Sequence, residues 1–180
     1  MLFFCYHRDR PGSADLRWAL REEHWSYMDG FADAMVARGP TYNGETATGS
    51  VHVLELADPA AARDFAFDEP GYQAGAYRDV LVRRWRDLLG RTMWDFAGDV
   101  GDDGYLVLGL GAGDPVDDVV PTDDSALVAY GPLLADDGDT WLGTVALLTA
   151  GSAEEACAVL TADRYDAVEV HRWMPGGRHP

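Results

Sequence analysis

His24 is the residue of this 180-residue chain whose type and position best suit it to chemistry. It lies between Leu20 and Met28 in a row of apolar residues at helical spacing, so its ring faces the packed side of a predicted helix. An imidazole on such a face needs a polar partner or an opening to a cavity. A partnered imidazole can move protons near neutral pH, which makes His24 a candidate general base. The alternative is a core histidine whose hydrogen bonds are satisfied within the protein.

Other residues could line the same cavity, and each has a structural alternative. His7 ends the first predicted strand, where it could reach the cavity or lie in an exposed turn. His52 and Ser50 share one face of a later strand. His52 could line the cavity or lie on the outer face of the sheet, and Ser50 could hydrogen-bond a substrate or only begin the strand. Three aromatic residues could wall the cavity or pack in the core: Trp25, Tyr27 and Tyr72.

Six predicted elements in the first half of the chain position these side chains. They are a strand over residues 1–6, a helix within residues 14–38, two strands of a hairpin over residues 35–56, a helix over residues 58–67 and a strand over residues 80–85. Ser13 suits the N-cap of the first helix, Asn43-Gly44 suits the hairpin turn, and Pro59 suits the first turn of the second helix. This order is that of a ferredoxin-like α+β module.

The hairpin recurs later in the chain, which predicts a second module. Residues 127–148 repeat the pattern of residues 35–56, with a Gly-Pro corner, a polar turn and a second strand in each copy. We therefore expect a module over residues 1–86 that carries the site, a connector over residues 87–104, a degenerate module over residues 105–174 and a frayed tail over residues 175–180. Two prolines between residues 113 and 121 indicate that the first helix of the second module is shortened or lost. His171 and His179, near the C-terminal end, are expected to be solvated.

Composition excludes several classes of function. The formal net charge is −17, which disfavours binding to nucleic acid or to anionic membranes. The chain has no lysine, so it has neither a Schiff-base lysine nor the lysine of a phosphate-binding loop. Two cysteines cannot form a thiolate metal site by themselves, and the acidic connector lacks the spacing of a calcium loop. We expect no metal, no cofactor and, because the apolar N-terminus is too short for a signal peptide, a cytoplasmic location.

Several short motifs of the first module resemble those of the YCII-related family, whose members are small ferredoxin-like proteins of the dimeric α+β barrel superfamily. They are Arg21-x-x-His24, Gly39-Pro40, Gly49-Ser50 and the run from Glu69 to Gly75 ahead of the final strand and Trp85. The second module is similar only through weaker matches, and it has no counterpart of His24. The resemblance implies that two modules pack sheet to sheet as a pseudo-dimeric α+β barrel, in a monomer or a homodimer.

The resemblance also implies an active pair. In this family a histidine of the first helix and an aspartate after the second helix form it, so His24 takes the first role. Glu69 takes the second, where the family usually has the shorter Asp, and the adjacent Asp68 could substitute for it. Some family members are lyases of small ring compounds, including ones that remove a halide.

A carboxylate on one imidazole nitrogen fixes the tautomer and raises the basicity of the other nitrogen. The sequence therefore predicts a cofactor-independent lyase, isomerase or cyclase that performs acid–base chemistry on a small organic molecule, cyclic ones included. The alternative is a non-catalytic module that binds a small molecule or acts as a scaffold.

Overall fold

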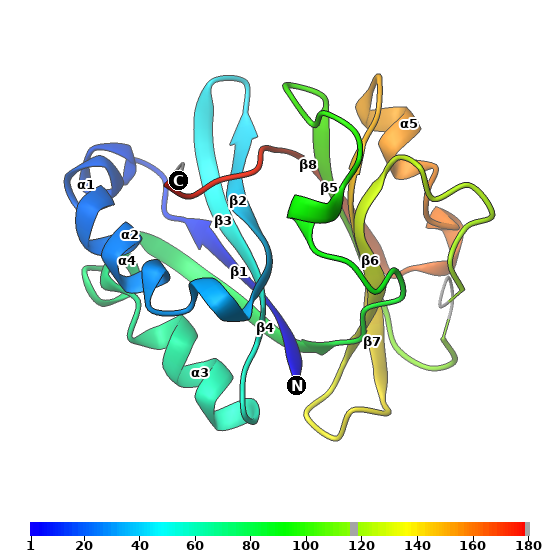
Figure 1. Cartoon of the computed structure of the whole chain (residues 1–180), viewed down its shortest axis with the longest axis horizontal. Coiled ribbons are helices and arrows are strands. Elements are labelled where there is room, and N and C mark those ends of the chain that lie inside the picture. Colours follow the sequence, from blue (N-terminus) through cyan, green and yellow to red (C-terminus); the bar gives the residue numbers. More distant parts are fainter. Residues whose placement is uncertain (116–118, 179–180) are drawn as a thin grey trace.

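The chain folds into one closed barrel of eight antiparallel strands, as a computed structural model shows (Figure 1). The structure describes residues 1–115 and 119–178. Around the barrel the strand order is β1-β3-β2-β8-β5-β7-β6-β4, so each half of the chain supplies four neighbouring strands. Both halves use the order fourth-first-third-second within their own sheet. The predicted α+β fold, two ferredoxin-like modules packed as a pseudo-dimeric barrel, is confirmed.

The bounds of the elements follow the predicted order closely in the first half. The strands are β1 (Leu2–Asp9), β2 (Met35–Asn43), β3 (Thr46–Glu55), β4 (Tyr77–Trp85), β5 (Gly104–Leu110), β6 (Leu127–Leu134), β7 (Trp141–Thr149) and β8 (Ala167–Trp173). The helices are α1 (Ala14–Ala19), α2 (Arg21–Asp29), α3 (Pro59–Phe67), α4 (Pro70–Gln73) and α5 (Ala153–Cys157), with short 3-10 turns η1 (Ala32–Ala34), η2 (Met93–Asp95) and η3 (Ala162–Arg164).

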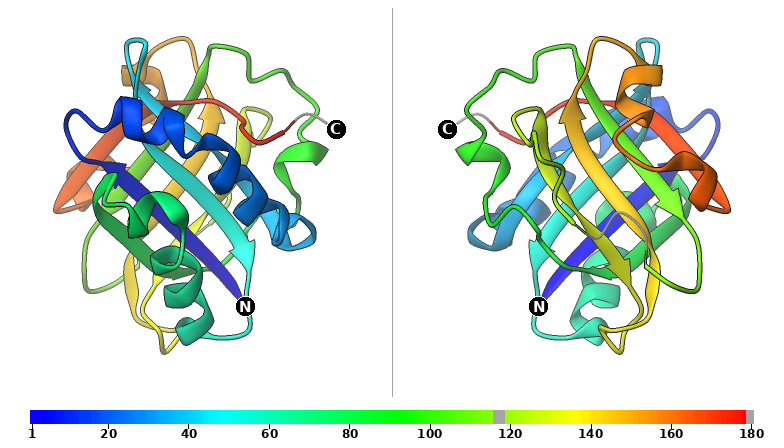
Figure 2. Two further views of the ribbon diagram at one scale, coloured as in Figure 1. Left: turned by 90° about the vertical axis from the view of Figure 1, so that its left-hand side faces the viewer. Right: turned by 90° about the vertical axis from the view of Figure 1, so that its right-hand side faces the viewer.

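The first sheet is buried on both faces because helices α1 to α4 cover its outer side (Figures 1 and 2). Strand β1 shows the two environments by alternation, since successive side chains of a strand point to opposite faces. Phe4 and Tyr6 point into the barrel, whereas Phe3 and Cys5 pack beneath the helices with Phe65 of α3. A strand of this kind is apolar on both faces, as residues 2–6 are.

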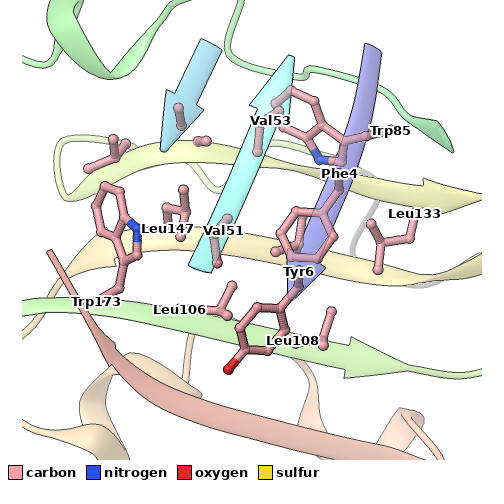
Figure 3. Close-up of a cluster of buried hydrophobic side chains, with 14 of the residues drawn as sticks. Phe4, Tyr6, Val51, Val53, Trp85, Leu106, Leu108, Leu133, Leu147 and Trp173 are labelled. Atoms are coloured by element: carbon pink, nitrogen blue, oxygen red, sulfur yellow. The ribbon is translucent and has the colours of Figure 1, made fainter. Parts of the chain in front are cut away.

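Side chains from both halves fill the barrel interior (Figure 3). Tyr6 and Val51 of the first half lie in one cluster with Leu106, Leu147 and Trp173 of the second, and each is at most 1% exposed. Neither half could bury this surface alone, so the two sheets stabilise each other by apolar contact. The helix-covered cluster of the first sheet is separate from this interior one.

The repeated Gly-Pro corners are the places where the two sheets join. At the first, the Met174 N–H donates to the Pro40 carbonyl at 3.2 Å and the Gly176 N–H donates to the Arg38 carbonyl at 3.0 Å. Pro40 has no backbone N–H, so it takes part in this corner only as a hydrogen-bond acceptor. A Cβ on Gly39 would overlap the carbonyl oxygen of Met174, so only glycine fits here.

The second corner repeats this geometry on the other side of the barrel. The Arg86 N–H donates to the Pro132 carbonyl at 3.2 Å, and the Leu88 N–H donates to the Tyr130 carbonyl at 3.0 Å. A Cβ on Gly131 would overlap the carbonyl oxygen of Arg86. The internal repeat of the sequence thus marks the two seams that close the barrel.

Several predicted boundaries are wrong. The first strand, predicted over residues 1–6, continues to Asp9. The helix predicted within residues 14–38 breaks at Leu20 into α1 and α2 and ends at Asp29, because Met35 already begins β2. The last strand of the first half begins at Tyr77 rather than at residue 80, and α4 lies before it, between the helix and the strand predicted over residues 58–67 and 80–85.

The tail predicted to be frayed is held in place over residues 174–178. Besides the two backbone hydrogen bonds at the first corner, the Arg178 guanidinium lies 3.3 Å from a Glu22 carboxylate oxygen and 3.4 Å from one of Asp29, both on α2. In Figure 1 this red segment runs from β8 across to the helices of the first half. His179 lies outside the described residues.

In its described residues the second half has no counterparts of α1 and α2, the helices that build a cavity in the first half. Within residues 111–115 and 119–126, which link β5 to β6, the structure has no helix. The predicted loss of this helix also involves residues 116–118, which lie outside the described residues. The described helices are all too short and too polar to cross a membrane.

Candidate active site

A cavity of about 270 Å³ lies between the outer face of the first sheet and helices α1 and α2. His24 and Met28 of α2 face it from one side, and Ser50 and His52 of β3 face it from the other. Its wall also includes Glu69, which immediately precedes α4. The cavity therefore depends on helices that only the first half of the chain contains among its described residues.

His24 and Glu69 form a hydrogen-bonded pair in this cavity. His24 Nδ1 lies 2.8 Å from Glu69 Oε1, and the Glu69 side chain is fully buried while that of His24 is 19% exposed. An ionised carboxylate only accepts hydrogen bonds, so Nδ1 is the protonated nitrogen of the neutral ring. His24 Nε2 has no hydrogen-bond partner among residues 1–115 and 119–178, which leaves it free to act on a ligand.

Local backbone structure holds the carboxylate in its orientation. Glu69 is the N-cap residue of α4, and its Oε2 accepts the Tyr72 N–H at 2.8 Å. Pro70 occupies the first position of that helix, where proline needs no hydrogen-bond donor. The side chain thus has one oxygen on the helix end and the other on His24.

The surroundings of Glu69 keep it ionised. Burial by itself would raise the pKa of this carboxyl group, but the hydrogen bond from His24, the charge of His24 and the N–H groups of Gly71 and Tyr72 lower it further than burial raises it. The net pKa lies below the ordinary value. A buried anion beside an imidazole stabilises the imidazolium that forms when the ring accepts a proton.

Arg17 of α1 provides a fixed positive charge in the cavity wall. Its guanidinium donates to both carboxylate oxygens of Asp9, at 3.0 and 2.8 Å, and to Ser50 Oγ at 2.7 Å. The side chain is 17% exposed, and its guanidinium carbon lies 5.6 Å from the centroid of the Tyr77 ring. A guanidinium held in this way can stabilise an anionic oxygen of a ligand without reorganising.

Tyr77 completes the polar floor. Burial, and then the negative charge of Glu69, raise the pKa of Tyr77 well above its ordinary value, so the hydroxyl stays protonated. A hydrogen bond with the Glu69 carboxylate contributes to the same shift. Tyr77 is therefore a neutral donor in the wall that also contains the His24–Glu69 pair.

Two further histidines lie close to His24 but stay neutral. Burial lowers the pKa of His52 well below 6.5, and the nearby charges of His24 and His7 add to the effect. Burial also lowers the pKa of His7, whose Nε2 lies 2.8 Å from the Ala66 carbonyl oxygen and so carries the proton. Within the described part of the chain, His24 is the one of these three histidines that has a carboxylate partner.

The buried His52 predicts acid sensitivity. A histidine whose pKa is depressed by folding contributes stability above the unfolded-state value of 6.5 and loses it as the pH falls below that value. We expect the free energy of unfolding to decrease between about pH 7 and about pH 5, and the His52→Gln variant to show a shallower slope. Denaturant unfolding at several pH values measures this slope. An equally steep decrease in the variant would contradict the assignment of His52 as a buried neutral group.

The cavity opening is formed by cationic and aromatic groups. The Arg21 guanidinium carbon lies 4.0 Å from the Trp18 ring and 5.0 Å from the Trp25 ring, while Trp18 itself is 70% exposed. Gly176 and Gly177 of the C-terminal segment line the opposite side of the opening. Arg178 then reaches back over Trp25, at 5.7 Å from its ring.

The structure brings most of the predicted site residues together. His24, Glu69, Ser50, His52 and Trp25 all line the cavity. His52 lies on the outer face of the sheet and also lines the cavity, because the outer face of β3 forms the cavity floor.

Four candidates lie elsewhere. Asp68 is exposed at the end of α3 and does not contact His24. His7 is neither in the cavity nor in an exposed turn, because it is fully buried behind Tyr77, with the two rings 4.8 Å apart. Tyr72 packs its ring on Phe67 and offers only its N–H to Glu69, and the Tyr27 hydroxyl donates to a backbone carbonyl in the core.

Sequence reasoning missed Arg17, Tyr77 and the C-terminal segment. One signal for Arg17 is present, since it lies seven residues before His24 and therefore on the same face of an α-helix. Tyr77 gives no comparable signal, because it precedes the strand predicted over residues 80–85. Among the described residues no group of His, Cys, Asp or Glu side chains is arranged to hold a metal ion.

Residues 1–86 match the model of the YCII-related domain. This confirms the predicted resemblance. An uncharacterized protein of Haemophilus influenzae is 26% identical over 98 residues, which make up 49% of this chain and 100% of that protein.

Solved structures extend the comparison. The 5-chloro-2-hydroxyhydroquinone dehydrochlorinase of Burkholderia phenoliruptrix AC1100, in complex with 2,5-dihydroxybenzoquinone, is 27% identical with a TM-score of 0.47, over 51% of this chain and 99% of that chain. A putative monooxygenase of Fusobacterium nucleatum is 9% identical with a TM-score of 0.53, over 97% of this chain and 91% of that chain. The second comparison shows that the fold of the whole chain, both halves included, is shared.

Proposed function

We propose that the protein is an acid–base enzyme that uses His24 and Glu69 to move a proton on a small organic molecule. The observation that carries this proposal is the 2.8 Å contact between His24 Nδ1 and Glu69 Oε1 in the wall of a cavity. The proposed reaction is that of a lyase, an isomerase or a cyclase, and the proposed substrates include cyclic molecules.

In the proposed reaction His24 Nε2 takes a proton from a carbon or oxygen of the substrate. The resulting imidazolium keeps its Nδ1–H on the buried Glu69 carboxylate, which stabilises the new positive charge. The electron pair left on the substrate moves onto an oxygen or expels a leaving group. The imidazolium then returns its proton to the product, so the enzyme ends in its starting state. A general base of this kind contributes about 10²- to 10⁴-fold to a rate.

Arg17 favours a substrate that develops negative charge on oxygen. Arg17 is fixed by Asp9 and Ser50, so it can face an enolate or phenolate oxygen without first changing state, whereas the Tyr77 hydroxyl gives its one hydrogen to the Glu69 carboxylate. The cavity, at about 270 Å³, is at the small end of ligand sites and suits a single ring with its substituents. Carbonyl and phenolic ring compounds are therefore the proposed substrate class.

The second half is proposed to be a degenerate copy of the first. It repeats the strand order and the Gly-Pro seam but has neither a histidine equivalent to His24 nor, within its described residues, the two helices that enclose the cavity. Its proposed role is to close the barrel and to supply the C-terminal segment that lines the cavity opening.

The proposal is tested by incubating the protein in deuterium oxide with a pooled set of small ring compounds bearing carbonyl or phenol groups. Mass spectrometry detects deuterium uptake at an acidic carbon or conversion to a product. We expect uptake or conversion of at least one compound class with native protein and much less with the Glu69→Gln variant. Binding of a compound without uptake or conversion would instead favour the non-catalytic binding module.

A further inference from the structure

A second cavity, of about 680 Å³, lies at the mouth of the barrel and is separate in chemistry from the first. Both halves of the chain line it: Tyr6, Arg8 and Thr48 from the first half, and Tyr105, His171 and Arg172 from the second. Tyr42 and Ala47 line both cavities, so the two are neighbours. None of the His24 chemistry uses this mouth.

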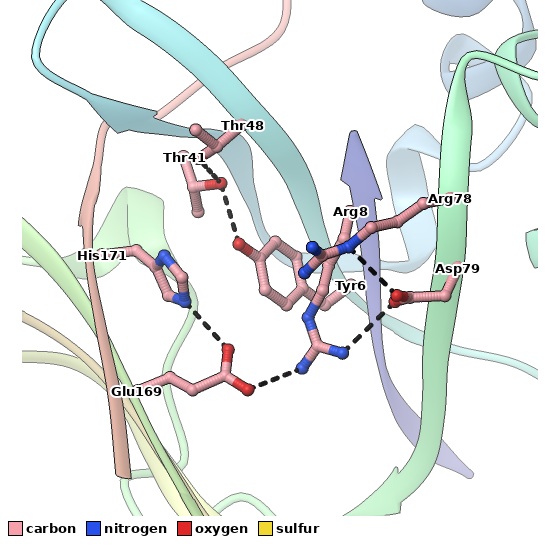
Figure 4. Close-up of polar contacts among 8 residues, drawn as sticks. All are labelled: Tyr6, Arg8, Thr41, Thr48, Arg78, Asp79, Glu169 and His171. Carbon is pink, nitrogen blue, oxygen red and sulfur yellow. Dashed lines mark hydrogen bonds and ion pairs between the residues drawn. The ribbon is translucent and has the colours of Figure 1, made fainter. Parts of the chain in front are cut away.

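A partly exposed polar network forms one wall of the mouth (Figure 4). His171 Nε2 lies 3.0 Å from one oxygen of Glu169, and Arg8 donates to the other oxygen at 3.1 Å. Arg8 also donates to Asp79 at 3.2 Å, which ties β1, β4 and β8 together. The expectation that His171 is simply solvated is therefore wrong, since its ring is only 27% exposed and has a carboxylate partner.

The carboxylate fixes the hydrogen-bonding role of His171. Hydrogen bonding to His171, followed by the charge of Arg8, lowers the pKa of Glu169, which therefore stays ionised and accepts the Nε2–H. The Nδ1 of the neutral ring is then an acceptor, and it has no hydrogen-bond partner among the described residues. The ring also lies edge-on to Tyr6, with 5.6 Å between centroids, so its plane is fixed.

The mouth carries an excess of positive charge. Four guanidinium groups line it, those of Arg8, Arg10, Arg78 and Arg172, against one carboxylate, Asp9, which is ion-paired with Arg17. Arg8 and Arg78 are ion-paired, whereas Arg10 and Arg172 have no carboxylate within ion-pairing distance in the part of the chain that the structure describes. Arg172 does donate one hydrogen bond to the Asp102 backbone carbonyl, which leaves its charge without an ion-pair partner. In a chain with a net charge of −17, two guanidinium groups without an ion-pair partner at one opening favour an anionic ligand.

Aromatic and hydroxyl groups define the rest of the surface. The Tyr6 hydroxyl lies 3.1 Å from Thr41 Oγ1, which in turn lies 3.1 Å from Thr48 Oγ1. The rings of Tyr42 and Tyr105 belong to the same lining. A flat ring with a polar substituent would therefore find both stacking surfaces and hydrogen-bond partners here.

We propose that the barrel mouth is a second ligand site, for a small aromatic carboxylate that carries a hydroxyl group. The carboxylate lies on Arg10 and Arg172, the ring packs among the tyrosines, and the hydroxyl donates to His171 Nδ1. This site is independent of the proposed reaction at His24, because it shares no charged residue with that cavity.

The test is a calorimetric titration of the full-length protein with para-hydroxybenzoate as the probe. We expect saturable binding that becomes at least tenfold weaker in the Arg10→Gln/Arg172→Gln double variant, whose two side chains are exposed and can be replaced without unfolding the barrel. The His171→Phe variant should weaken para-hydroxybenzoate but not benzoate, which lacks the hydroxyl. The His24→Ala variant should bind the probe as the native protein does.

Several outcomes would overturn the proposal. These are unchanged binding in the double variant, loss of binding in His24→Ala, which would place the probe in the first cavity, and displacement of the probe by equimolar inorganic phosphate, which would show a site for any small anion. Equal binding of para-hydroxybenzyl alcohol, which has no carboxylate, would remove the role of the arginines. Because none of these results depends on turnover at His24, the second site and the proposed function fail independently.

Discussion

The His24→Ala variant should lose about 10²- to 10⁴-fold of the deuterium-uptake or turnover rate, and also some stability because the buried Glu69 carboxylate loses one of its hydrogen-bond partners. The imidazole is the group that accepts the proton in the proposed reaction, and no neighbour can replace it. His52 and His7 are both held neutral by burial, and Asp68 is exposed and remote from the ring. His24 is partly exposed to the cavity, so its removal leaves an opening rather than a void in a packed core.

The matched control is His171→Ala. It removes a second imidazole that is also hydrogen-bonded to a carboxylate, but at the barrel mouth rather than in the cavity. Its uptake rate should stay within about twofold of the native value, since it contacts no reacting atom in the proposed mechanism. Equal losses in the two variants, or full activity in His24→Ala, would contradict the assignment of His24 as the base.

The Gly39→Ala variant should destabilise the fold by about 3 kcal/mol or more. The added methyl group would meet the carbonyl oxygen of Met174 and the Trp173 ring, and neither can move without separating β2 from β8. Chemical denaturation measures the loss. Because Gly39 also lines the cavity, displaced β2 should weaken ligand binding as well.

Two further glycine variants show whether the loss of stability in Gly39→Ala comes from the clash at the seam or from replacing a glycine as such. Gly131→Ala places the same methyl against the Arg86 carbonyl at the opposite seam, so a similar loss of stability is expected without a direct effect on the cavity. Gly44→Ala lies in the hairpin turn, where the methyl would meet nothing within 4 Å but the backbone has φ +59°. It should cost only about 1–2 kcal/mol of backbone strain. A larger loss for Gly44→Ala than for Gly39→Ala would argue against the seam as the vulnerable point.

Much of the fold could be predicted from local patterns. The alternation and turn chemistry of residues 35–56 predict a hairpin, and Asp58 with Pro59 predicts the start of α3, where the Asp58 side chain does accept the Ala61 N–H. The repeat predicts two modules, but the reason that each copy keeps Gly-Pro is a contact between segments far apart in the sequence. Local reasoning could not supply it.

The errors have a common physical cause, which is the competition between local pattern and distant contacts. Met35 continues the apolar row of the first helix, yet it begins β2 because pairing with β3 buries it. The tail contains glycines and arginine and is typical of a frayed end, but Gly176 adds a hydrogen bond at the seam.

The site was predictable in part. His24 stands out because a titratable residue interrupts an apolar row, whereas the choice of Glu69 depended on the resemblance to a family. Glutamate is one methylene longer than the usual aspartate. Its carboxylate is nevertheless oriented toward His24, because its other oxygen is held by the N–H at the start of α4. Arg17 acquires its role only through Asp9 and Ser50, which lie on two different strands, and no local pattern joins these three residues.

The most direct test of the central claim is heteronuclear NMR of the histidine ring nitrogens, recorded at a pH where the rings are neutral. If Glu69 orients His24, the native protein will show His24 as the Nδ1–H tautomer, with Nε2 as the acceptor that a base requires, and the Glu69→Ala variant will lose this preference. A native His24 in the Nε2–H tautomer, or a tautomer that does not change when Glu69 is removed, would contradict the account.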